Sequence, residues 1–150
     1  MRFVVDCMLG KLARILRMLG YDTLYFKNIE DAELAWISRN ENRILITRDT
    51  ILQRRFNTFC TILLQSQQID NEIKELKQFL PEISCAQSFS RCIECNNLLI
   101  KLIKNKLENN VPPYVFSTHD DFAYCKNCGK IYWKGTHVEN MKKRFKSWCL

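Results

Sequence analysis

Over the first 80 residues, the spacing of hydrophobic residues switches repeatedly between a pattern typical of strands and one typical of helices. Apolar runs with β-branched residues predict strands at 2–6, 22–26, 43–47 and 59–65. Apolar residues at helical spacing predict helices at 8–19, 30–41, 49–56 and 68–80. Strands that alternate with helices in this way form right-handed βαβ units, which build a parallel sheet with helices on both faces. We therefore predict a small three-layer α/β domain over residues 1–80, with strands 2–6, 43–47 and 59–65 at the centre of its sheet.

This rhythm stops at Pro81. Residues 81–91 show no period and suit a linker, and residues 92–150 form a separate, more polar module. Within the module, YVFS at 114–117 predicts a short strand. Residues 136–148 predict a basic amphipathic terminal helix, with apolar residues on one side at Val138, Met141, Phe145 and Trp148.

Two C-x-x-C pairs flank the middle of this module: Cys92 with Cys95, and Cys125 with Cys128. Zn²⁺ favours four tetrahedral ligands, and a C-x-x-C turn directs two thiolates at one ion. Gly129 follows the second pair, where a positive φ is useful. We predict one structural zinc ion and a zinc ribbon; the alternatives are reduced thiols or a redox motif. His119 and His137 are further candidate ligands, although four cysteines already complete the shell.

The beginning of the chain lacks the pattern of a signal peptide, and no apolar stretch is long enough to span a membrane. We therefore expect a cytoplasmic protein with no membrane partner, in which disulfides are rare. Cys7 and Cys60 lie in apolar runs and are predicted to be buried as small hydrophobic residues. Cys85 and Cys149 have no evident sequence partner.

The net charge of +7 suggests a polyanionic partner. Residues 1–80 hold 12 basic and 10 acidic residues, whereas residues 81–150 hold 11 and 6, so most of the excess lies in the second module. Residues that could stack on bases or contact phosphates surround the second cysteine pair: Lys126, Lys130, Tyr132, Trp133 and Lys134. The alternative is that Tyr132 and Trp133 fill the core of the ribbon.

Acidic residues follow two of the predicted strands. Asp6 ends the strand at 2–6 and Asp49 comes just after the strand at 43–47, so the two carboxylates meet at one sheet edge if those strands are neighbours. Asp31 and Glu33, at the start of the helix at 30–41, can reach the same crevice. Oxygen ligands of this kind suit Mg²⁺ or Mn²⁺. Alternatively, Asp6, Asp31 and Asp49 serve only as helix N-caps.

Basic residues recur every third position along the helix at 8–19, at Lys11, Arg14 and Arg17. Together with Arg48 they are candidates for contact with a nucleic-acid backbone, although a solvated helix face is the alternative. The chain lacks both G-x-G-x-x-G and G-x-x-x-x-G-K-[ST], which argues against a dinucleotide or P-loop nucleotide site.

Taken together, these motifs resemble the PIN-like ribonuclease family, in the branch named for the C-terminal domain of the mutator-seven exonuclease. The resemblance is carried in order by FVVDCMLGKLARILRMLGYDT, DAEL, RILITRD, RCIECN, VPPYV and CKNCGKIYWKGTH. It implies a PIN-like domain followed by a zinc ribbon, and a metal-dependent endoribonuclease acting on RNA. The other functions considered are a non-catalytic RNA-binding module and a module that docks on a ribosome or a protein partner.

The resemblance also implies roles for single residues. Asp6, Asp31, Glu33 and Asp49 match the catalytic acids, and Asp6, Glu33 and Asp49 would hold Mg²⁺ or Mn²⁺. Thr47 and Arg48 complete a T-R-D motif, and Lys11 and Arg14 match basic positions. The chain departs from the family's arrangement of acids at TILLQSQQID, where no acid follows the predicted strand at 59–65 until Asp70. The resemblance therefore leaves the number of catalytic ions open.

Overall fold

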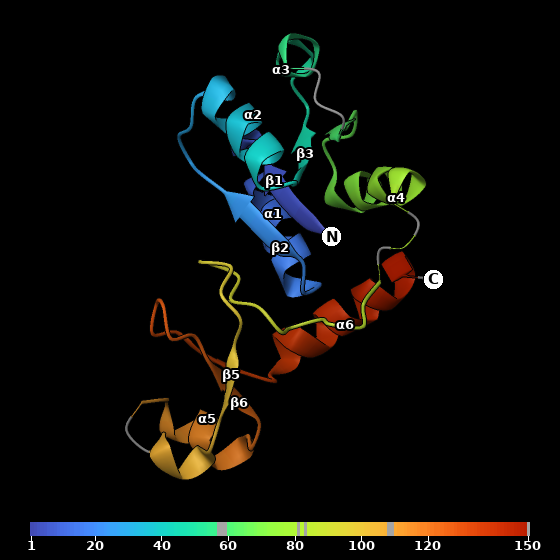
Figure 1. Cartoon of the computed structure of the whole chain (residues 1–150). Coiled ribbons are helices and arrows are strands. Elements are labelled where there is room, and N and C mark those ends of the chain that lie inside the picture. Colours follow the sequence, from blue (N-terminus) through green and yellow to red (C-terminus); the bar gives the residue numbers. More distant parts are fainter. Residues whose placement is uncertain (57–59, 81, 83, 108–109, 150) are drawn as a thin grey trace.

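The chain forms an α/β lobe, a small antiparallel sheet and a long terminal helix (Figure 1). The computed structural model describes residues 1–56, 60–80, 82, 84–107 and 110–149; Phe59 of a predicted strand and Pro81 and Ile83 of the predicted linker lie outside them. The strands are β1 Arg2–Val5, β2 Asp22–Tyr25, β3 Ile44–Thr47, β4 Thr61–Leu63, β5 Ile100–Leu102, β6 Phe122–Tyr124 and β7 Ile131–Trp133. The α-helices are α1 Gly10–Met18, α2 Asp31–Asn40, α3 Thr50–Arg55, α4 Ile69–Phe79, α5 Pro113–Thr118 and α6 Thr136–Cys149.

The first four strands form one parallel sheet in the order β2-β1-β3-β4. The prediction that β1 and β3 are central is confirmed. The prediction for the strand at 59–65 is wrong, because β4 lies at an edge and pairs with β3. Its apolar run has another cause: Ile62 and Leu64 are buried in the main hydrophobic core, which includes residues of α1 and α4.

Helices cover both faces of this sheet, which confirms the three-layer prediction. Phe3, Val5 and Ile46 face a core shared with α1, α4 and α6. Val4 and Leu45 point to the opposite face and pack against α2 and α3. Because successive strand residues alternate between two buried faces, the strands are apolar throughout.

Gly20 follows Leu19, the C-cap residue of α1, and has a φ of 95°, a conformation that favours glycine just after a helix. A Cβ here would meet the backbone carbonyl of Gln87, whereas Gly129, with a φ of 73°, has open space around it.

We expect Gly20→Ala to lower the free energy of unfolding by about 3 kcal/mol and Gly129→Ala by about 1 kcal/mol. Urea unfolding of both variants measures the difference, and equal losses would contradict the close approach.

The terminal helix α6 packs on the α/β lobe. Three of the four apolar residues predicted on one side of this helix, Met141, Phe145 and Trp148, are buried in the main core, whereas Val138 is half-buried. Asp70, on α4, accepts two hydrogen bonds from Arg144, at 3.0 and 2.8 Å, and one from the Trp148 indole at 2.9 Å. Asp70 therefore anchors α6 to α4.

The hydrogen bonds from Arg144 hold the pKa of Asp70 below its usual range. A depressed carboxylate pKa stabilises the fold above the unfolded-state pKa, and the effect disappears as the pH falls through the folded-state value. We expect Asp70→Asn to cost at most about 1 kcal/mol at pH 7, since the pair is partly exposed, and progressively less as the pH falls below the ordinary aspartate pKa of about 3.9. Thermal unfolding across this range tests it, with Glu139→Gln, on the same helix, as control. A cost that does not change with pH would contradict the assignment.

Strands β5, β6 and β7 form an antiparallel sheet with a small core of Leu107, Val111 and Phe122. The predicted strand at 114–117 is wrong, because these residues lie in α5. Pro113 opens that helix at its first position, where the fixed φ of proline and its missing N–H are tolerated. The β-branched and aromatic residues of YVFS therefore pack from a helix, with Val115 and Phe116 against the ribbon core.

Cys7 and Cys60 are exposed, so the prediction that both are buried is wrong. Cys7 lies in a 3-10 turn after β1, and Cys60 precedes β4, so neither continues the apolar strand beside it. None of the helices in the described part of the chain has the length and apolar character to cross a membrane.

Candidate functional site

Asp6 and Asp49 lie at the carboxyl edge of neighbouring strands. The backbone N–H of Asp6 donates to the Ile46 carbonyl at 3.0 Å, which extends the β1–β3 ladder to the sheet edge. The Asp6 side chain is buried, and its Oδ2 accepts a 2.6 Å hydrogen bond from the Thr47 hydroxyl. The same hydroxyl accepts from the Asp49 N–H at 2.9 Å. Thr47 therefore connects the two acids.

The N-cap alternative holds for Asp49 but not for Asp6. Oδ1 of Asp49 accepts from the N–H groups of Ile51 and Leu52, at 2.7 and 3.2 Å, and so caps α3. Asp6 precedes the 3-10 turn without a capping hydrogen bond. Its carboxylate instead interacts with the thiol of Cys7 and raises the pKa of that thiol, chiefly through a side-chain hydrogen bond.

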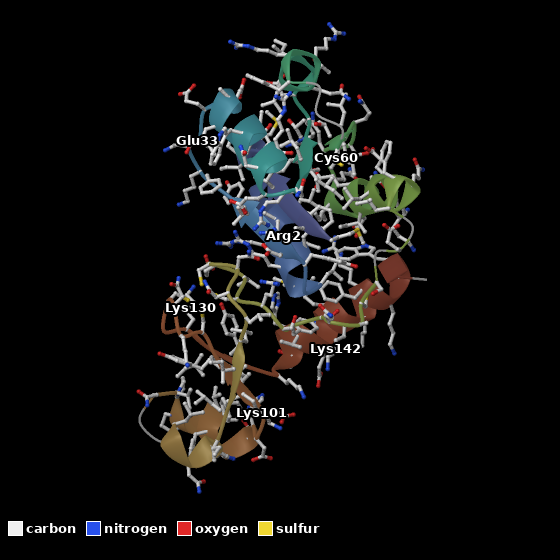
Figure 2. The ribbon with its side chains drawn as sticks, viewed as in Figure 1. Arg2, Glu33, Cys60, Lys101, Lys130 and Lys142 are labelled. Atoms are coloured by element: carbon white, nitrogen blue, oxygen red, sulfur yellow. The ribbon has the colours of Figure 1, made fainter. Side chains whose placement is uncertain are left out.

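Asp31 and Glu33 lie in the first turn of α2, where they complement the helix dipole. Asp31 is close enough to Cys7 to raise the pKa of that thiol further, whereas Glu33 is exposed on α2 (Figure 2). Neither side chain caps the helix, because the N-cap residue is Glu30. Across the described residues, Asp6, Glu33 and Asp49 are not brought within mutual metal-ligand distance.

Arg48 extends from β3 toward the turn after β1. Its Nη2 donates to the Met8 carbonyl at 3.1 Å, and Nη1 lies 3.7 Å from Oε1 of Glu72. Nε of Arg48 is buried and has no hydrogen-bond partner among the described residues. A buried donor of this kind is normally satisfied by water or by a ligand.

Glu72 is a residue of this region that the sequence reasoning missed. It lies on α4 and is 5% exposed, and burial raises its pKa. Arg48 and Lys11 oppose that shift, so both cations lie near its carboxylate. The available signal was its position among Ile69, Ile73 and Leu76, since an acid within an apolar helical stripe is unusual.

The three predicted basic positions of α1 have different environments. Lys11 is exposed, and Arg14 is 57% exposed and paired with Glu94 at 3.2 Å. Arg17 is 5% exposed and donates to the carbonyls of Thr23, Ile93 and Glu94 at 2.8–2.9 Å. Its guanidinium therefore holds the first cysteine turn against the α/β lobe, and its placement offers no support for the predicted RNA contact.

The four predicted zinc ligands converge at one point. The Sγ atoms of Cys92, Cys95, Cys125 and Cys128 all lie within 4.8 Å of one another. Cys92 and Cys128 are 3.5 Å apart, and Cys95 and Cys125 are 3.3 Å apart. Four thiolates around Zn²⁺, each about 2.3 Å from the ion, would be about 3.8 Å apart. The cluster therefore fits one tetrahedral zinc ion.

The two cysteine turns share one backbone geometry. In each, the N–H four residues after the first cysteine donates to that cysteine's carbonyl at 2.9 Å. The donors, Asn96 and Gly129, have positive φ values of 70° and 73°. The prediction of a positive φ at Gly129 is confirmed. Asn96 performs the same function in the first turn, because asparagine tolerates this conformation.

The thiols of the cluster shift one another's pKa values in opposite directions. Burial acts to raise the pKa of Cys95, but hydrogen bonds from Asn97 and the neighbouring thiols lower it to about 6. The Lys130 N–H acts to lower the pKa of Cys128, but burial and the other cysteines raise it to about 12. One thiolate thus forms at the expense of another. Only a bound cation lets all four ionise together.

The ribbon is attached to the edge strand β2 through Asn96. Its side-chain oxygen accepts from the Thr23 N–H at 2.9 Å, and its Nδ2 donates to Asp22 at 2.8 Å. Arg91 adds hydrogen bonds to the carbonyls of Gly20 and Asn96. These contacts cover one edge of the parallel sheet and fix the cysteine cluster relative to the lobe.

The comparison with known families covers almost the whole chain. The family model described as "Mut7-C RNAse domain" matches residues 1–145. No curated protein matches the chain. The matched segment includes both the acidic sheet edge and the four-cysteine cluster.

Proposed function

Because the chain belongs to the Mut7-C RNAse domain family, we propose that it hydrolyses RNA phosphodiester bonds at the carboxyl edge of β1 and β3. The observation that carries the proposal is the Thr47 hydroxyl, which donates to Asp6 and accepts from the Asp49 backbone. This arrangement ties the Asp6 carboxylate to the backbone of the second acid, Asp49, at the sheet edge, where ligands of parallel sheets bind. Their oxygen atoms are the donors that Mg²⁺ and Mn²⁺ prefer.

We propose that Asp6 and Asp49, with Asp31 or Glu33 from α2, hold the catalytic cation. When bound, Mg²⁺ or Mn²⁺ would neutralise the phosphate and activate water for attack on phosphorus. Carboxylates without a compensating charge repel one another. We therefore expect Glu33 to approach Asp6 only when a cation is bound.

Arg48 and Lys11 are the proposed phosphate contacts. The buried Nε of Arg48 lacks a partner among the described residues and is available to a phosphate oxygen or its water. Lys11 is exposed near Glu72. Arg14 shares Glu94 with Lys130, so it contributes less free charge to RNA. The four cysteines would hold a structural zinc ion that fixes the ribbon.

An end-labelled RNA assay tests the proposed activity. Zinc-loaded protein is incubated with RNA with and without added Mn²⁺ or Mg²⁺; no chelator is used, because a chelator would also remove zinc. We expect cleavage only with the added ion, and products that carry a 5′-phosphate. RNA that is bound but left intact would support a non-catalytic RNA-binding module. Co-purification with ribosomes or one protein, without cleavage, would support an interaction module. Either outcome overturns the proposal.

A further inference from the structure

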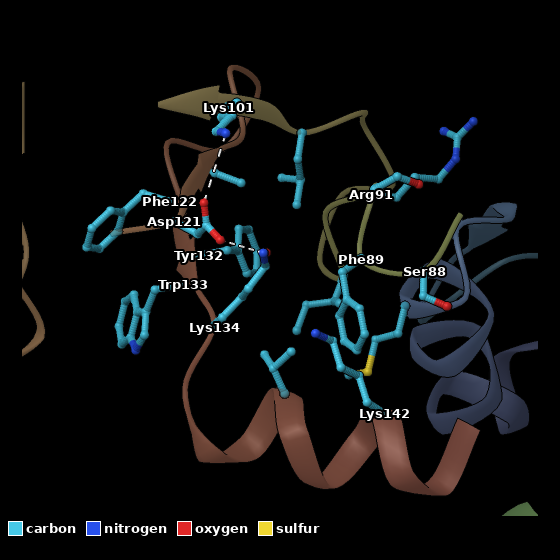
Figure 3. A pocket seen from close by; sticks show the side chains of 16 residues that line it. Ser88, Phe89, Arg91, Lys101, Asp121, Phe122, Tyr132, Trp133, Lys134 and Lys142 are labelled. Carbon is cyan, nitrogen blue, oxygen red and sulfur yellow. Dashed lines mark hydrogen bonds and ion pairs between the residues drawn. The ribbon is translucent and has the colours of Figure 1, made fainter. Parts of the chain in front are cut away.

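A groove of about 420 Å³ lies between the ribbon, segment 88–91 and α6 (Figure 3). Met18 at the end of α1 and residues of β5, β6 and β7 contribute to its walls. Its volume is within the range of pockets that bind small molecules or single residues of a larger ligand. Its lining contains none of the acids at the β1–β3 edge, so it is a different site from the proposed catalytic one.

The mouth of the groove has an excess of positive charge. Lys101 and Lys134 come from β5 and the end of β7, and Lys142 comes from α6. Among the described residues of the lining, Asp121 is the one acid; it lies 2.6 Å from Lys134 and 4.0 Å from Lys101. Arg91 turns away to the carbonyls of Gly20 and Asn96 (Figure 3). Three lysines against one carboxylate leave a surplus that suits a ligand with several negative charges.

Phe89 is held at this groove in an unusual backbone conformation. Its φ is 64°, which bulky residues rarely adopt and which costs about 1–3 kcal/mol. Its N–H donates to the Met18 carbonyl at 2.6 Å, and its ring stacks on Phe145 at 5.4 Å between centroids. Phe145 thus supports one face of the ring, while the side chain lines the groove.

Tyr132 supplies a second ring from the ribbon side. Its hydroxyl lies 3.1 Å from Sγ of Cys92, which fixes the ring beside the cysteine cluster. Phe89 and Tyr132 therefore come from different parts of the fold and are each held by a separate contact. Figure 3 shows both beside the lysines of the groove. Fixed aromatic rings beside lysines are the elements that bind single-stranded nucleic acids through base stacking and phosphate contact.

We propose that this groove binds a single-stranded segment of RNA, with an unpaired base against Phe89 and Tyr132 and phosphates against Lys134 and Lys142. The proposal rests on the proposed ribonuclease function, since it assigns a second contact to the same substrate. Helix α1 connects the two sites, because it begins after the turn that follows Asp6 and ends at Met18. Its nine residues span about 13 Å. The groove would therefore hold nucleotides a short distance from the scissile bond.

Binding of a fluorescein-labelled oligouridylate, measured by anisotropy without Mn²⁺, tests the phosphate contacts. We compare Lys134→Gln/Lys142→Gln with Lys143→Gln/Lys146→Gln. The second pair removes the same charge from α6, and neither of its residues is among the described residues that line the groove. We expect the first pair to weaken binding about 10-fold and to reduce the salt slope by about 1.4, from two lost contacts. The control pair should weaken binding less than about 2-fold. Equal losses for the two pairs would overturn the proposal.

Photocrosslinking with a 4-thiouridine oligoribonucleotide tests the base contact. We expect crosslinked peptides that contain Phe89 or Tyr132. Crosslinks confined to other segments would overturn the proposal. A protein that binds an acidic peptide through Lys134 and Lys142 but does not bind RNA would also overturn it. Both binding experiments use protein without Mn²⁺ and do not depend on cleavage. A protein that binds RNA in the groove but does not cleave it when Mn²⁺ is added would therefore contradict the ribonuclease function and not the groove. Conversely, cleavage with crosslinks elsewhere would contradict only the groove.

Discussion

Asp6→Asn is expected to lower the rate of Mn²⁺-dependent RNA cleavage by about 100- to 1,000-fold while the protein remains folded. Asparagine has the size of aspartate, and its side-chain oxygen can still accept the hydrogen bond from Thr47. The substitution therefore removes the negative charge and little else. Single-turnover cleavage of end-labelled RNA measures the effect, and zinc content and thermal unfolding verify that the variant is intact.

Asp49→Asn should show a similar loss. Asparagine is as good an N-cap as aspartate, so α3 keeps the hydrogen bonds to Ile51 and Leu52. The matched control is Asp120→Asn, which changes a carboxylate that is 90% exposed in the ribbon and should leave the rate unchanged. Cleavage at the wild-type rate by both Asp6→Asn and Asp49→Asn would rule out the proposed site.

Cys125→Ser is expected to remove the bound zinc and to unfold the ribbon. Cys125 is fully buried, and over the described residues of the ribbon the buried hydrophobic cluster consists of Leu107, Val111 and Phe122. So small a core cannot offset the entropy of ordering this module, and structural zinc contributes about 10 kcal/mol or more in comparable modules. We expect one zinc ion per wild-type chain, none in the variant, and a large fall in thermal stability.

Zinc content by elemental analysis, together with thermal unfolding, measures both effects. The control is Cys60→Ser, which changes an exposed free cysteine outside the cluster. It should retain the full zinc content and the wild-type unfolding temperature. A Cys125→Ser protein that still binds one zinc ion and unfolds at the wild-type temperature would contradict the structural role of the cluster.

Local patterns predicted much of this molecule because each depends on few residues. The period of apolar positions predicted β1 and β3 as central strands. Their adjacency then placed Asp6 and Asp49 at one edge. The C-x-x-C spacing predicted the cluster, and Gly129 its turn.

The structure departs from what local patterns suggest where a distant contact decides the outcome. Arg17 follows the basic stripe of α1, but the carbonyls of Ile93 and Glu94 satisfy it inside the structure. The stripe alone cannot reveal partners that lie more than 70 residues away along the chain. Ile62 and Leu64, within the predicted strand at 59–65, are buried in the core against helices, and an apolar pattern alone cannot distinguish this position from a central place in the sheet.

The docking of the ribbon on the α/β lobe could not be predicted from local sequence patterns either. Asn96 lies in the first cysteine turn, and its side chain bridges Thr23 and Asp22 of the α/β lobe, more than 70 residues away along the chain. Glu72 lies within the apolar stripe of α4, and that stripe alone does not reveal the cations of Arg48 and Lys11 near its carboxylate. Both residues show that a polar group at a buried position is defined by its partners, which only the folded structure provides.

We propose that the protein binds two cations at separate places, a catalytic one at the β1–β3 edge and zinc in the ribbon. The most direct measurement is anomalous scattering from crystals of the zinc-loaded protein soaked in MnCl₂, recorded on both sides of the manganese and zinc absorption edges. We expect a manganese peak held by carboxylate oxygens of Asp6 and Asp49, and a zinc peak among the four cysteines. A manganese peak that lies elsewhere, or none within ligand distance of Asp6 and Asp49, would contradict the claim.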